Sequence, residues 1–242
     1  MIGLGSFALL SVAVFLGAFI SGLAGFAFSA VAGAILLHMF QPLEAVPLMM
    51  ACSVGVQAAN LWALRKSIRW KESLILVLGG LLGVPVALWL LHHADARTFQ
   101  QVFGLIVSIY SAYMLFKPRL SHPQQMSQSR TALIGFGGGL IGGLTAMPGA
   151  LPTIWCDIHG LPKNLQRGLV QPFIAAMQIF ALSVMLARHD LSASVLIELG
   201  LSIPALLAGS MLGILAFRSI QELMFRRIIL ITLFFSGVLL VV

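Results

Sequence analysis

The chain has 242 residues, of which 60% are hydrophobic and only 9% are charged, and its mean hydropathy is +1.03. Soluble domains carry about 25% charged residues, so this composition excludes a water-soluble globular protein and predicts an integral membrane protein. A net charge of +7 would suggest nucleic acid as the partner of a soluble protein. In a membrane protein it is better explained by basic residues at helix ends, so we expect the lipid bilayer as partner and no nucleic acid.

Other composition features narrow the function further. Cys52 and Cys156 both lie inside apolar segments, which disfavours a disulfide framework and a thiolate metal site. The N-terminus lacks the basic region and cleavage site of a signal peptide, so we expect the first hydrophobic segment to stay in the protein. Signatures of hydrolases, metalloproteases and P-loop ATPases are absent. We therefore expect no enzyme activity, no metal and no cofactor.

Two hydrophobic runs are too long for a single membrane crossing. Residues 4–37 form a run of 34 without a charged side chain, and residues 131–161 form a run of 31 with only Asp157 and His159. One crossing takes about 20 residues, so each run must break or fold back. The breaks are the glycine-rich stretches 21–25 and 142–152. Backbone released from a helix at membrane depth must lie against protein or a water-filled cavity, and such breaks are typical of transport sites. The alternative is that these glycines only pack helices closely.

The segments follow the same order in both halves of the chain. The first repeat, 1–117, contains a hairpin and three apolar helices, which we expect over residues 4–38, 45–64, 73–91 and 98–116. A polar linker, 118–129, separates it from the second repeat, 130–242. There we expect a hairpin and three helices over residues 131–161, 168–187, 192–217 and 225–242. At an offset of 121, Gln57 falls on Gln178. The sequence thus predicts an all-α polytopic membrane protein built from two repeats.

The distribution of Lys and Arg distinguishes parallel from inverted repeats. If each broken run crosses once, both halves point the same way and the basic residues divide 8 to 6. If each run is a hairpin that returns to its starting side, twelve basic residues share one side and only Arg97 and Arg188 face the other. The positive-inside rule favours the second arrangement. We therefore predict inverted-topology repeats, each a glycine- and proline-broken helical hairpin plus three transmembrane helices, with both termini outside.

Two hairpins that dip in from opposite faces would bring their tips together near the middle of the membrane. The returning halves begin near Phe26 and Leu151, and each would point its N-terminus at that place. Helix N-termini carry free N–H groups and about half a positive charge, which suits an anion. Pro152 fits a first helical turn, where its missing N–H has no effect. This arrangement predicts a small anionic substrate.

Polar residues are rare within the full crossings. Gln57 and Asn60 share one helix face, and Arg167, Gln171 and Gln178 share a face of the corresponding helix in the second repeat. Pseudo-symmetry would bring Gln57 and Gln178 to the same depth, where two amides can donate hydrogen bonds to an oxyanion without a buried charge. The alternative is that these side chains only tie helices together.

The remaining candidates are residues at the tips and two charged side chains. At the tips we expect backbone or hydroxyl groups to contact the substrate. The candidates are Gly25, Ser29, Thr145, Pro148 and Gly149. Arg167 has a fork suited to sulfonate or carboxylate oxygens, although it equally fits a cytoplasmic anchor. Glu198 lies inside a crossing, where ionisable groups are costly and mark proton paths, unless it reaches the outer surface. It is the candidate for proton coupling.

The second break resembles a known family signature. Residues 142–168, GGLTAMPGALPTIWCDIHGLPKNLQRG, are similar to the second-half signature of the TauE/SafE family of sulfite and organosulfonate exporters. The positions that carry the resemblance are Pro148, Gly149, Pro152, Gly160, Leu161, Lys163 and Arg167. Residues 21–48 are similar to the opening signature of the family, at Gly22, Gly25, Pro42, Ala45 and Pro47. Ala150 and Leu151 depart from the pattern because they separate the two prolines of the turn.

The resemblance implies a multi-pass transporter of the bacterial inner membrane. The distribution of basic residues would then place both termini in the periplasm. Its substrate would be a small sulfur-containing or organic anion such as sulfite, sulfoacetate or a related sulfonate, moved outward by a secondary transporter. Proton- or sodium-coupled uptake of an organic anion, a passive anion channel and a membrane-embedded scaffold are the alternatives. A homodimer is compatible with the sequence, but an all-apolar surface gives no interface.

Overall fold

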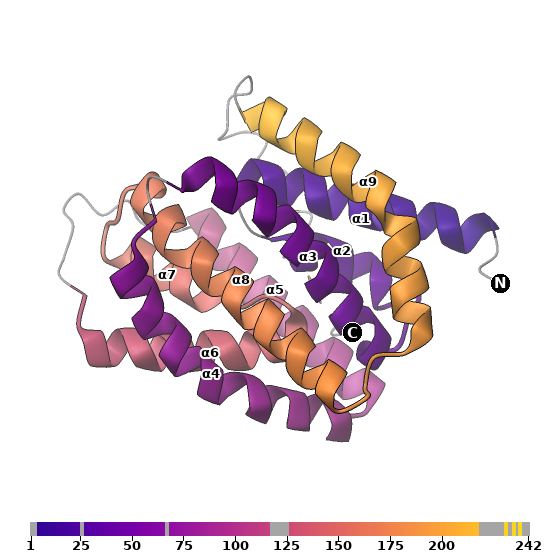
Figure 1. Cartoon of the computed structure of the whole chain (residues 1–242), viewed down its shortest axis with the longest axis horizontal. Coiled ribbons are helices and arrows are strands. Elements are labelled where there is room, and N and C mark those ends of the chain that lie inside the picture. Colours follow the sequence, from indigo (N-terminus) through magenta and orange to yellow (C-terminus); the bar gives the residue numbers. More distant parts are fainter. Residues whose placement is uncertain are drawn as a thin grey trace.

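The computed structural model describes residues 4–24, 27–65, 68–116 and 126–217, together with 230–231, 234–235 and 237–238. Its named elements in these ranges are helices, without strands (Figure 1). They are α1 (Leu4–Ala24), α2 (Phe28–Leu36), α3 (Pro42–Leu64), α4 (Trp70–His93), α5 (Ala96–Phe116), α6 (Gln128–Thr145), α7 (Ala150–Ile158), α8 (Lys163–Ala187) and α9 (Ala193–Phe217). Six of these are long and apolar enough to cross a membrane, namely α1, α3, α4, α5, α8 and α9. The chain is therefore an all-helical, multi-pass membrane protein.

Both long hydrophobic runs are broken at the glycine-rich stretches. A 21-residue α1 is followed by a nine-residue α2, and an 18-residue α6 is followed by a nine-residue α7. Each junction holds an alanine in the left-handed region, with φ of 83° at Ala27 and 55° at Ala146. L-residues seldom adopt this conformation because Cβ crowds the following carbonyl oxygen. The backbone at both breaks is therefore held against its local preference.

Five helices begin two to five residues earlier than the apolar pattern suggests. They start at Pro42, Trp70, Ala96, Gln128 and Lys163, whereas the expected starts are residues 45, 73, 98, 131 and 168. The missed residues form first turns that are rich in polar or interfacial side chains, which hydropathy alone assigns to loops. Pro42 sits at the first helical position, where its missing N–H has no effect. Most of the expected helix over residues 225–242 lies outside the described residues.

The long helix of each broken segment packs along a helix of the other repeat. α1 lies along α9, and α6 lies along α4 (Figure 1). Glycines allow the two backbones to touch: a methyl group at Gly139 would overlap the carbonyl oxygen of Gly80, and one at Gly213 would overlap that of Phe19. Such close approach of small residues is the main source of helix association in lipid. The two halves are thus interleaved rather than folded as separate lobes.

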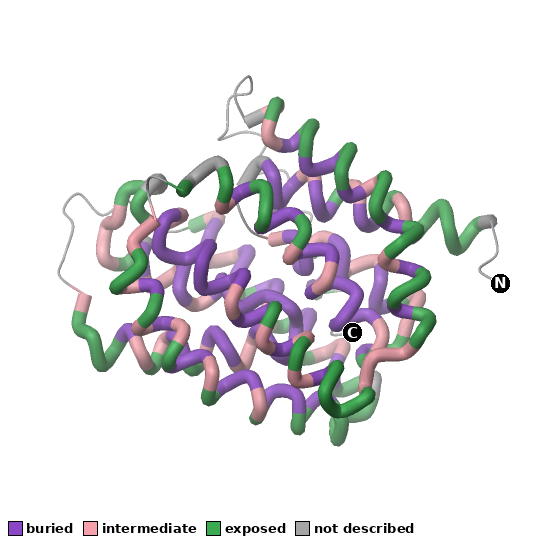
Figure 2. The backbone as a smooth tube through the Cα atoms, in the orientation of Figure 1, coloured by how far each residue is buried: buried purple, intermediate pink, exposed green. Residues whose placement is uncertain are grey.

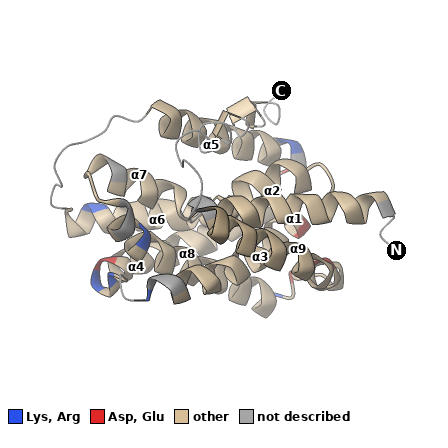
Figure 3. Cartoon of the chain, turned by 90° about the horizontal axis from the view of Figure 1, so that it is seen from above, with Lys and Arg blue, Asp and Glu red and all other residues tan. Residues whose placement is uncertain are grey.

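Contacts between loops fix the direction of the helices. The backbone N–H of Arg69, just before α4, donates to the carbonyl oxygen of Gly168 near the start of α8, at 3.0 Å. At the other end of the bundle, His92 Nε2 lies 3.2 Å from Asp190 Oδ1. α3 therefore ends where α8 begins, and these two helices run in opposite directions. Figure 3 marks the charged residues on the ribbon, and most of them lie toward the ends of the helices.

Each broken segment starts and finishes at one end of the bundle. α1 runs parallel to α9, which begins just after Asp190, so α1 starts at the His92 end of the bundle. The segment returns to the same end, because Gln100 Nε2 at the start of α5 donates to the carbonyl oxygen of Leu37 at the end of α2, at 2.8 Å. α6 runs parallel to α4 from the Arg69 end, and α7 leads back to the start of α8. The two broken segments thus enter from opposite ends.

The outward faces of the crossing helices are apolar. Leu74, Leu78 and Leu82 on α4 are 57%, 58% and 70% exposed, and Ile203 and Leu207 give α9 a similar surface. Figure 2 shows these exposed faces around a buried centre formed mainly by α2, α3 and α8. A surface of this kind suits contact with lipid chains. The polar residues of the crossings lie instead in the centre.

The close contact between α4 and α6 can be tested with one methyl group. Gly139→Ala should lower the free energy of unfolding by about 1–3 kcal/mol, because the new Cβ would overlap backbone atoms of α4 that cannot rotate away. Gly200→Ala on α9 is the matched control, since nothing lies within 4 Å of its added Cβ. Thermal unfolding of both variants in detergent measures the difference. Equal melting temperatures would contradict the packing described here.

Candidate functional site

A small pocket lies where the two breaks meet. Its walls come from the first turn of α2, one face of α3, the junction before α7 and one face of α8, and the lining residues are Ala27, Phe28, Ser29, Ser53, Gln57, Ala146, Met147, Pro148, Gly149, Ala150, Ile174 and Gln178. The space open to the centres of water molecules is about 20 Å³, which is room for a water or two. Gln57 and Gln178 lie about two thirds of the way along helices that run in opposite directions. The pocket is therefore well inside the bundle, away from both charged ends.

The lining residues follow the duplication of the sequence. Ten of the twelve form five pairs, one member from each repeat, that differ by 121 in number: 27 and 148, 28 and 149, 29 and 150, 53 and 174, and 57 and 178. The other two, Ala146 and Met147, correspond to residues 25 and 26, which lie outside the described residues. Equivalent positions of both repeats thus face one space.

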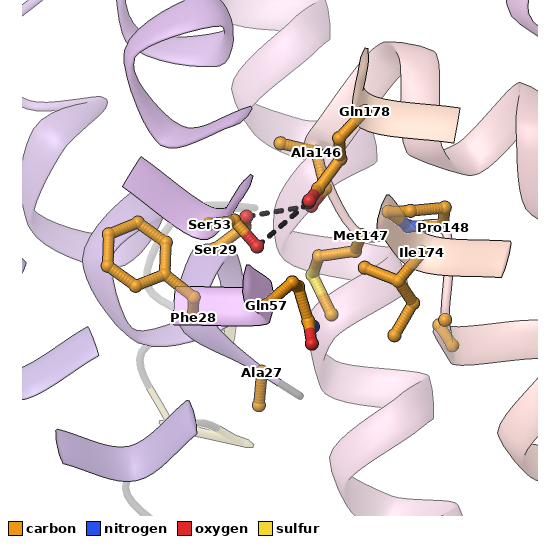
Figure 4. Close-up of a pocket in the computed structure, with 12 residues that line it drawn as sticks. Ala27, Phe28, Ser29, Ser53, Gln57, Ala146, Met147, Pro148, Ile174 and Gln178 are labelled. Carbon is orange, nitrogen blue, oxygen red and sulfur yellow. Dashed lines mark hydrogen bonds between the residues drawn. The ribbon is translucent and has the colours of Figure 1, made fainter. Parts of the chain in front are cut away.

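The carbonyl oxygen of Ala146 is the point at which the walls are tied together. Ser29 Oγ donates to it at 2.7 Å, and Gln178 Nε2 donates to it at 3.2 Å (Figure 4). Gln178 Nε2 also donates to Ser53 Oγ at 2.9 Å. These side chains are buried, with exposed fractions of 3% or less. The bonds satisfy the carbonyl group that the break releases from helical hydrogen bonding, and they connect α2, α3 and α8.

The short helices leave their N-terminal N–H groups without a side-chain cap. α2 is preceded by Ala27, which makes no side-chain capping bond, and α7 is preceded by Gly149, which has no side chain. The first N–H groups of a helix have no partner within it and carry the positive end of its dipole. Both helix starts line this uncharged pocket, and the first turn of α2 offers N–H donors that suit an anion. In the first turn of α7 the N–H of Ala150 already donates to the carbonyl oxygen of Met147 at 3.3 Å and Pro152 has no N–H, so α7 contributes mainly the positive end of its dipole.

The two glutamines line the pocket but present acceptors to it. The sequence suggested that the amide of Gln178 donates to the substrate. In the structure both hydrogens of its Nε2 are donated to Ala146 and Ser53, so neither is free. Its Oε1 is buried and has no hydrogen-bond partner. The Oε1 of Gln57 is also buried without a partner. Each side chain is 1% exposed.

Several residues predicted for the site lie elsewhere. Asn60 and Gln171 are buried on α3 and α8, but neither lines the pocket. Arg167 is near the start of α8, about 16 Å along the helix from Gln178 at 1.5 Å per residue. Thr145 ends α6 beside the pocket, and its hydroxyl donates to the carbonyl oxygen of Ile141 at 2.7 Å. These residues were predicted together with the glutamines because they share a helix face with them. A shared face does not fix the depth of a residue along the helix.

One predicted position, Gly25, lies outside the described part of the chain. Pro148 and Gly149, in contrast, line the pocket as members of the second break.

Glu198 lies on α9, outside the pocket lining. It is 5% exposed, and its Oε2 has no hydrogen-bond partner. The charge of Glu44, in the first turn of α3, acts on it. This is a second polar position in the bundle, separate from the meeting point of the breaks.

Seven of the lining residues were not predicted from the sequence: Ala27, Phe28, Ser53, Ala146, Met147, Ala150 and Ile174. Ser53 is one turn before Gln57 on α3, and Ile174 is its counterpart before Gln178, so the same-face rule could have found both. The Ala146 carbonyl leaves no signal in a sequence, because every residue has one. Among the described residues no group of three or more His, Cys, Asp or Glu side chains could hold a metal ion.

Comparison with known proteins agrees with this architecture. The family model described as "Sulfite exporter TauE/SafE" matches residues 9–240, nearly the whole chain. The chain belongs to the TauE/SafE family. No match was found among curated proteins or among solved structures. As a TauE/SafE member the chain is a membrane transporter of a family associated with sulfite export, and both breaks lie within the matched range.

The hydrogen bonds to the Ala146 carbonyl oxygen predict a measurable coupling in this TauE/SafE chain. Ser29→Ala or Gln178→Met alone leaves the carbonyl one donor and should cost about 0.5–1.5 kcal/mol of stability. The double variant leaves the buried carbonyl without either donor, so its loss should exceed the sum of the single losses by at least about 0.5 kcal/mol. A double-mutant cycle by denaturant unfolding in detergent measures this coupling.

Ser183→Ala is the control for this cycle. Ser183 also lies on α8 and donates to a backbone carbonyl, that of Ile179 at 2.8 Å, but it is exposed and distant in sequence from the break. Combined with Gln178→Met, it should give additive losses. Additive losses for Ser29 and Gln178 as well would show that the shared carbonyl does not couple them.

Proposed function

We propose that the chain is a secondary transporter that exports a small sulfur-containing or organic anion, such as sulfite, sulfoacetate or a related sulfonate, through the pocket between the two breaks. The observation that carries the proposal is the meeting of two uncapped helix starts in one buried, polar space. The anion would bind to N–H groups of α2 and at the positive end of the α7 dipole, close to Ser53, Gln57, Pro148 and Gly149. Membership of the TauE/SafE family supports a sulfur-containing substrate.

The repeats in this proposal are inverted and the site lies near the middle of the membrane. Support comes from the opposite directions of α3 and α8, and from the entry of the two broken segments from opposite ends. At the Arg69 end the described basic residues are Arg65, Arg69, Lys71, Arg130 and Arg167, whereas the other end has Arg97 and Arg188. The positive-inside rule then makes the Arg69 end cytoplasmic, in a bacterial inner membrane with both termini periplasmic.

Export of an anion needs no coupled ion. An inside-negative potential favours outward movement by about 2.3 kcal/mol per charge per 100 mV. The small size of the pocket favours alternating exposure of the site over a passive anion channel, which would need a continuous open path. Opening toward either face would widen the pocket enough for the anion to reach the helix starts.

A second candidate function is proton- or sodium-coupled uptake of an organic anion. The observation that favours it is Glu198, which is buried, has an oxygen without a partner and faces the charge of Glu44. Ionisable groups at such depth are costly and often belong to ion paths. Coupled uptake would require transport to depend on a proton or sodium gradient and on Glu198, whereas uncoupled export would survive Glu198→Gln.

Transport can be measured as electrogenic flux in proteoliposomes. We expect a saturable current with at least one anion from a panel of sulfite, sulfoacetate, taurine, thiosulfate and lactate. The Gln57→Ala/Gln178→Ala double variant should lose most of this current, because both side chains line the pocket. Gln100→Ala on α5, outside the pocket, is the control. Absence of current for every anion with folded protein would exclude electrogenic export, and neutral exchange would be tested next.

The orientation can be tested with single cysteines, since both native cysteines are buried. Ala94→Cys, exposed at the His92 end, should react with a membrane-impermeant maleimide added to intact spheroplasts. Ser127→Cys, exposed at the Arg69 end, should react only after the membrane is permeabilised. The reverse labelling would overturn the proposed orientation but leave the pocket unaffected.

A further inference from the structure

We propose that the pocket selects anions that keep a hydrogen-bond donor, such as a hydroxyl, ammonium or acidic proton, beside their oxyanion group. This inference rests on the proposed function and concerns the substrate class of the same site. In this proposal Gln57 and Gln178 are specificity-determining residues that accept a hydrogen bond from this donor. The helix starts bind the oxygens of the oxyanion.

The orientation of the Gln178 amide is fixed by a backbone group. A carbonyl oxygen can only accept, so the amide nitrogen of Gln178, and not its oxygen, must face Ala146 at 3.2 Å. The second amide hydrogen goes to Ser53 Oγ at 2.9 Å. Gln178 Oε1 therefore has a defined position, with two lone pairs and no donor. What this side chain can offer a ligand is an acceptor.

Gln57 adds a second acceptor at the equivalent position of the first repeat. Its Oε1 is buried without a partner, and it lines the same pocket (Figure 4). The two acceptors share one pocket and occupy positions related by the offset of 121. A ligand that donates hydrogen bonds would satisfy both of them. Water can occupy the pocket in the absence of such a ligand.

The donors and acceptors of the pocket then match the two ends of one molecule. The start of α2 provides N–H groups for sulfonate or carboxylate oxygens, and the start of α7 adds the positive end of its dipole. Ser53 Oγ accepts from Gln178, so its own hydrogen can be donated to the same oxygens. The glutamine oxygens receive the donor of the ligand. A fully deprotonated dianion without a donor, such as sulfoacetate at neutral pH, would instead place its oxygens against these acceptors and leave them unsatisfied. Among the anions named for the proposed function, the donor requirement therefore favours hydrogensulfite and disfavours sulfoacetate.

A matched pair of probes distinguishes a requirement for a hydrogen-bond donor from general anion binding. 2-Hydroxyethanesulfonate and ethanesulfonate have the same charge and nearly the same size, but only the first has a hydroxyl donor. We expect the hydroxylated anion to bind the full-length protein in nanodiscs about 5- to 150-fold more tightly, as measured by titration calorimetry. This ratio of dissociation constants corresponds to the free-energy cost of leaving one buried acceptor unpaired.

Variants assign the preference to the glutamines. Gln57→Met removes an acceptor for which the structure shows no partner, so it should reduce the preference for the hydroxylated probe to below about threefold while ethanesulfonate still binds. Gln100→Met on α5 removes a glutamine whose Nε2 bonds to Leu37, outside the pocket, and should keep the full preference. Retention of the preference in Gln57→Met and in Gln178→Met would overturn the assignment.

A measurement on the unchanged protein covers the case in which a variant does not fold. None of the twelve residues that line the pocket is titratable, so a pH dependence of sulfite binding would come from the ligand. Binding should weaken as pH rises through the pKa at which hydrogensulfite loses its proton. Binding of 2-hydroxyethanesulfonate should stay constant over the same range. Sulfite binding that strengthens with pH would contradict the proposal.

The outcomes distinguish this inference from the proposed function. If both sulfonates bind equally well, the donor requirement is wrong but anion transport through the pocket stands. If neither sulfonate binds and no anion in the flux panel is transported, the proposed function fails and this inference falls with it. A preference for ethanesulfonate would overturn the donor requirement directly.

Discussion

The hydrogen bonds to the carbonyl oxygen of Ala146 are the interaction on which the centre of the structure depends. A helix break inside an apolar bundle exposes backbone groups that water cannot reach, and each must find a partner within the protein. Ser29 comes from the first repeat and Gln178 from the second, so the carbonyl joins the two halves at the point where both are broken. The same bonds hold Ala146 in its left-handed conformation, which the chain would not adopt by preference.

Close helix packing makes this meeting point possible. The long broken helix of each predicted repeat packs along a helix of the other: α1 lies on α9 and α6 lies on α4. Glycines such as Gly83 and Gly139 bring these backbones into contact, and lipid-facing leucines cover the outside. The described parts of residues 1–117 and 130–242 are therefore interleaved and do not pack as two separate lobes.

The sequence predicted the parts of the site that follow from breaks and periodicity. Glycine and proline in an overlong apolar run mark a break, and an offset of 121 pairs Gln57 with Gln178, which both line the pocket. Depth and hydrogen-bond direction could not be predicted in the same way. Asn60, Gln171 and Arg167 share faces with the glutamines but lie at other levels, and the role of the Gln178 amide depends on a backbone carbonyl that no residue type reveals.

The bonds at the pocket also indicate how costly its opening would be. Moving the two repeats apart at the pocket would break the bond from Ser29 to Ala146 and that from Gln178 to Ser53, since both connect different repeats, whereas the bond from Gln178 to Ala146 lies within one repeat. Each such bond contributes about 0.5–1.5 kcal/mol net, so these two bonds together would oppose opening by about 1–3 kcal/mol. In the proposed transport cycle, a ligand that binds the open state better by that amount would offset their loss.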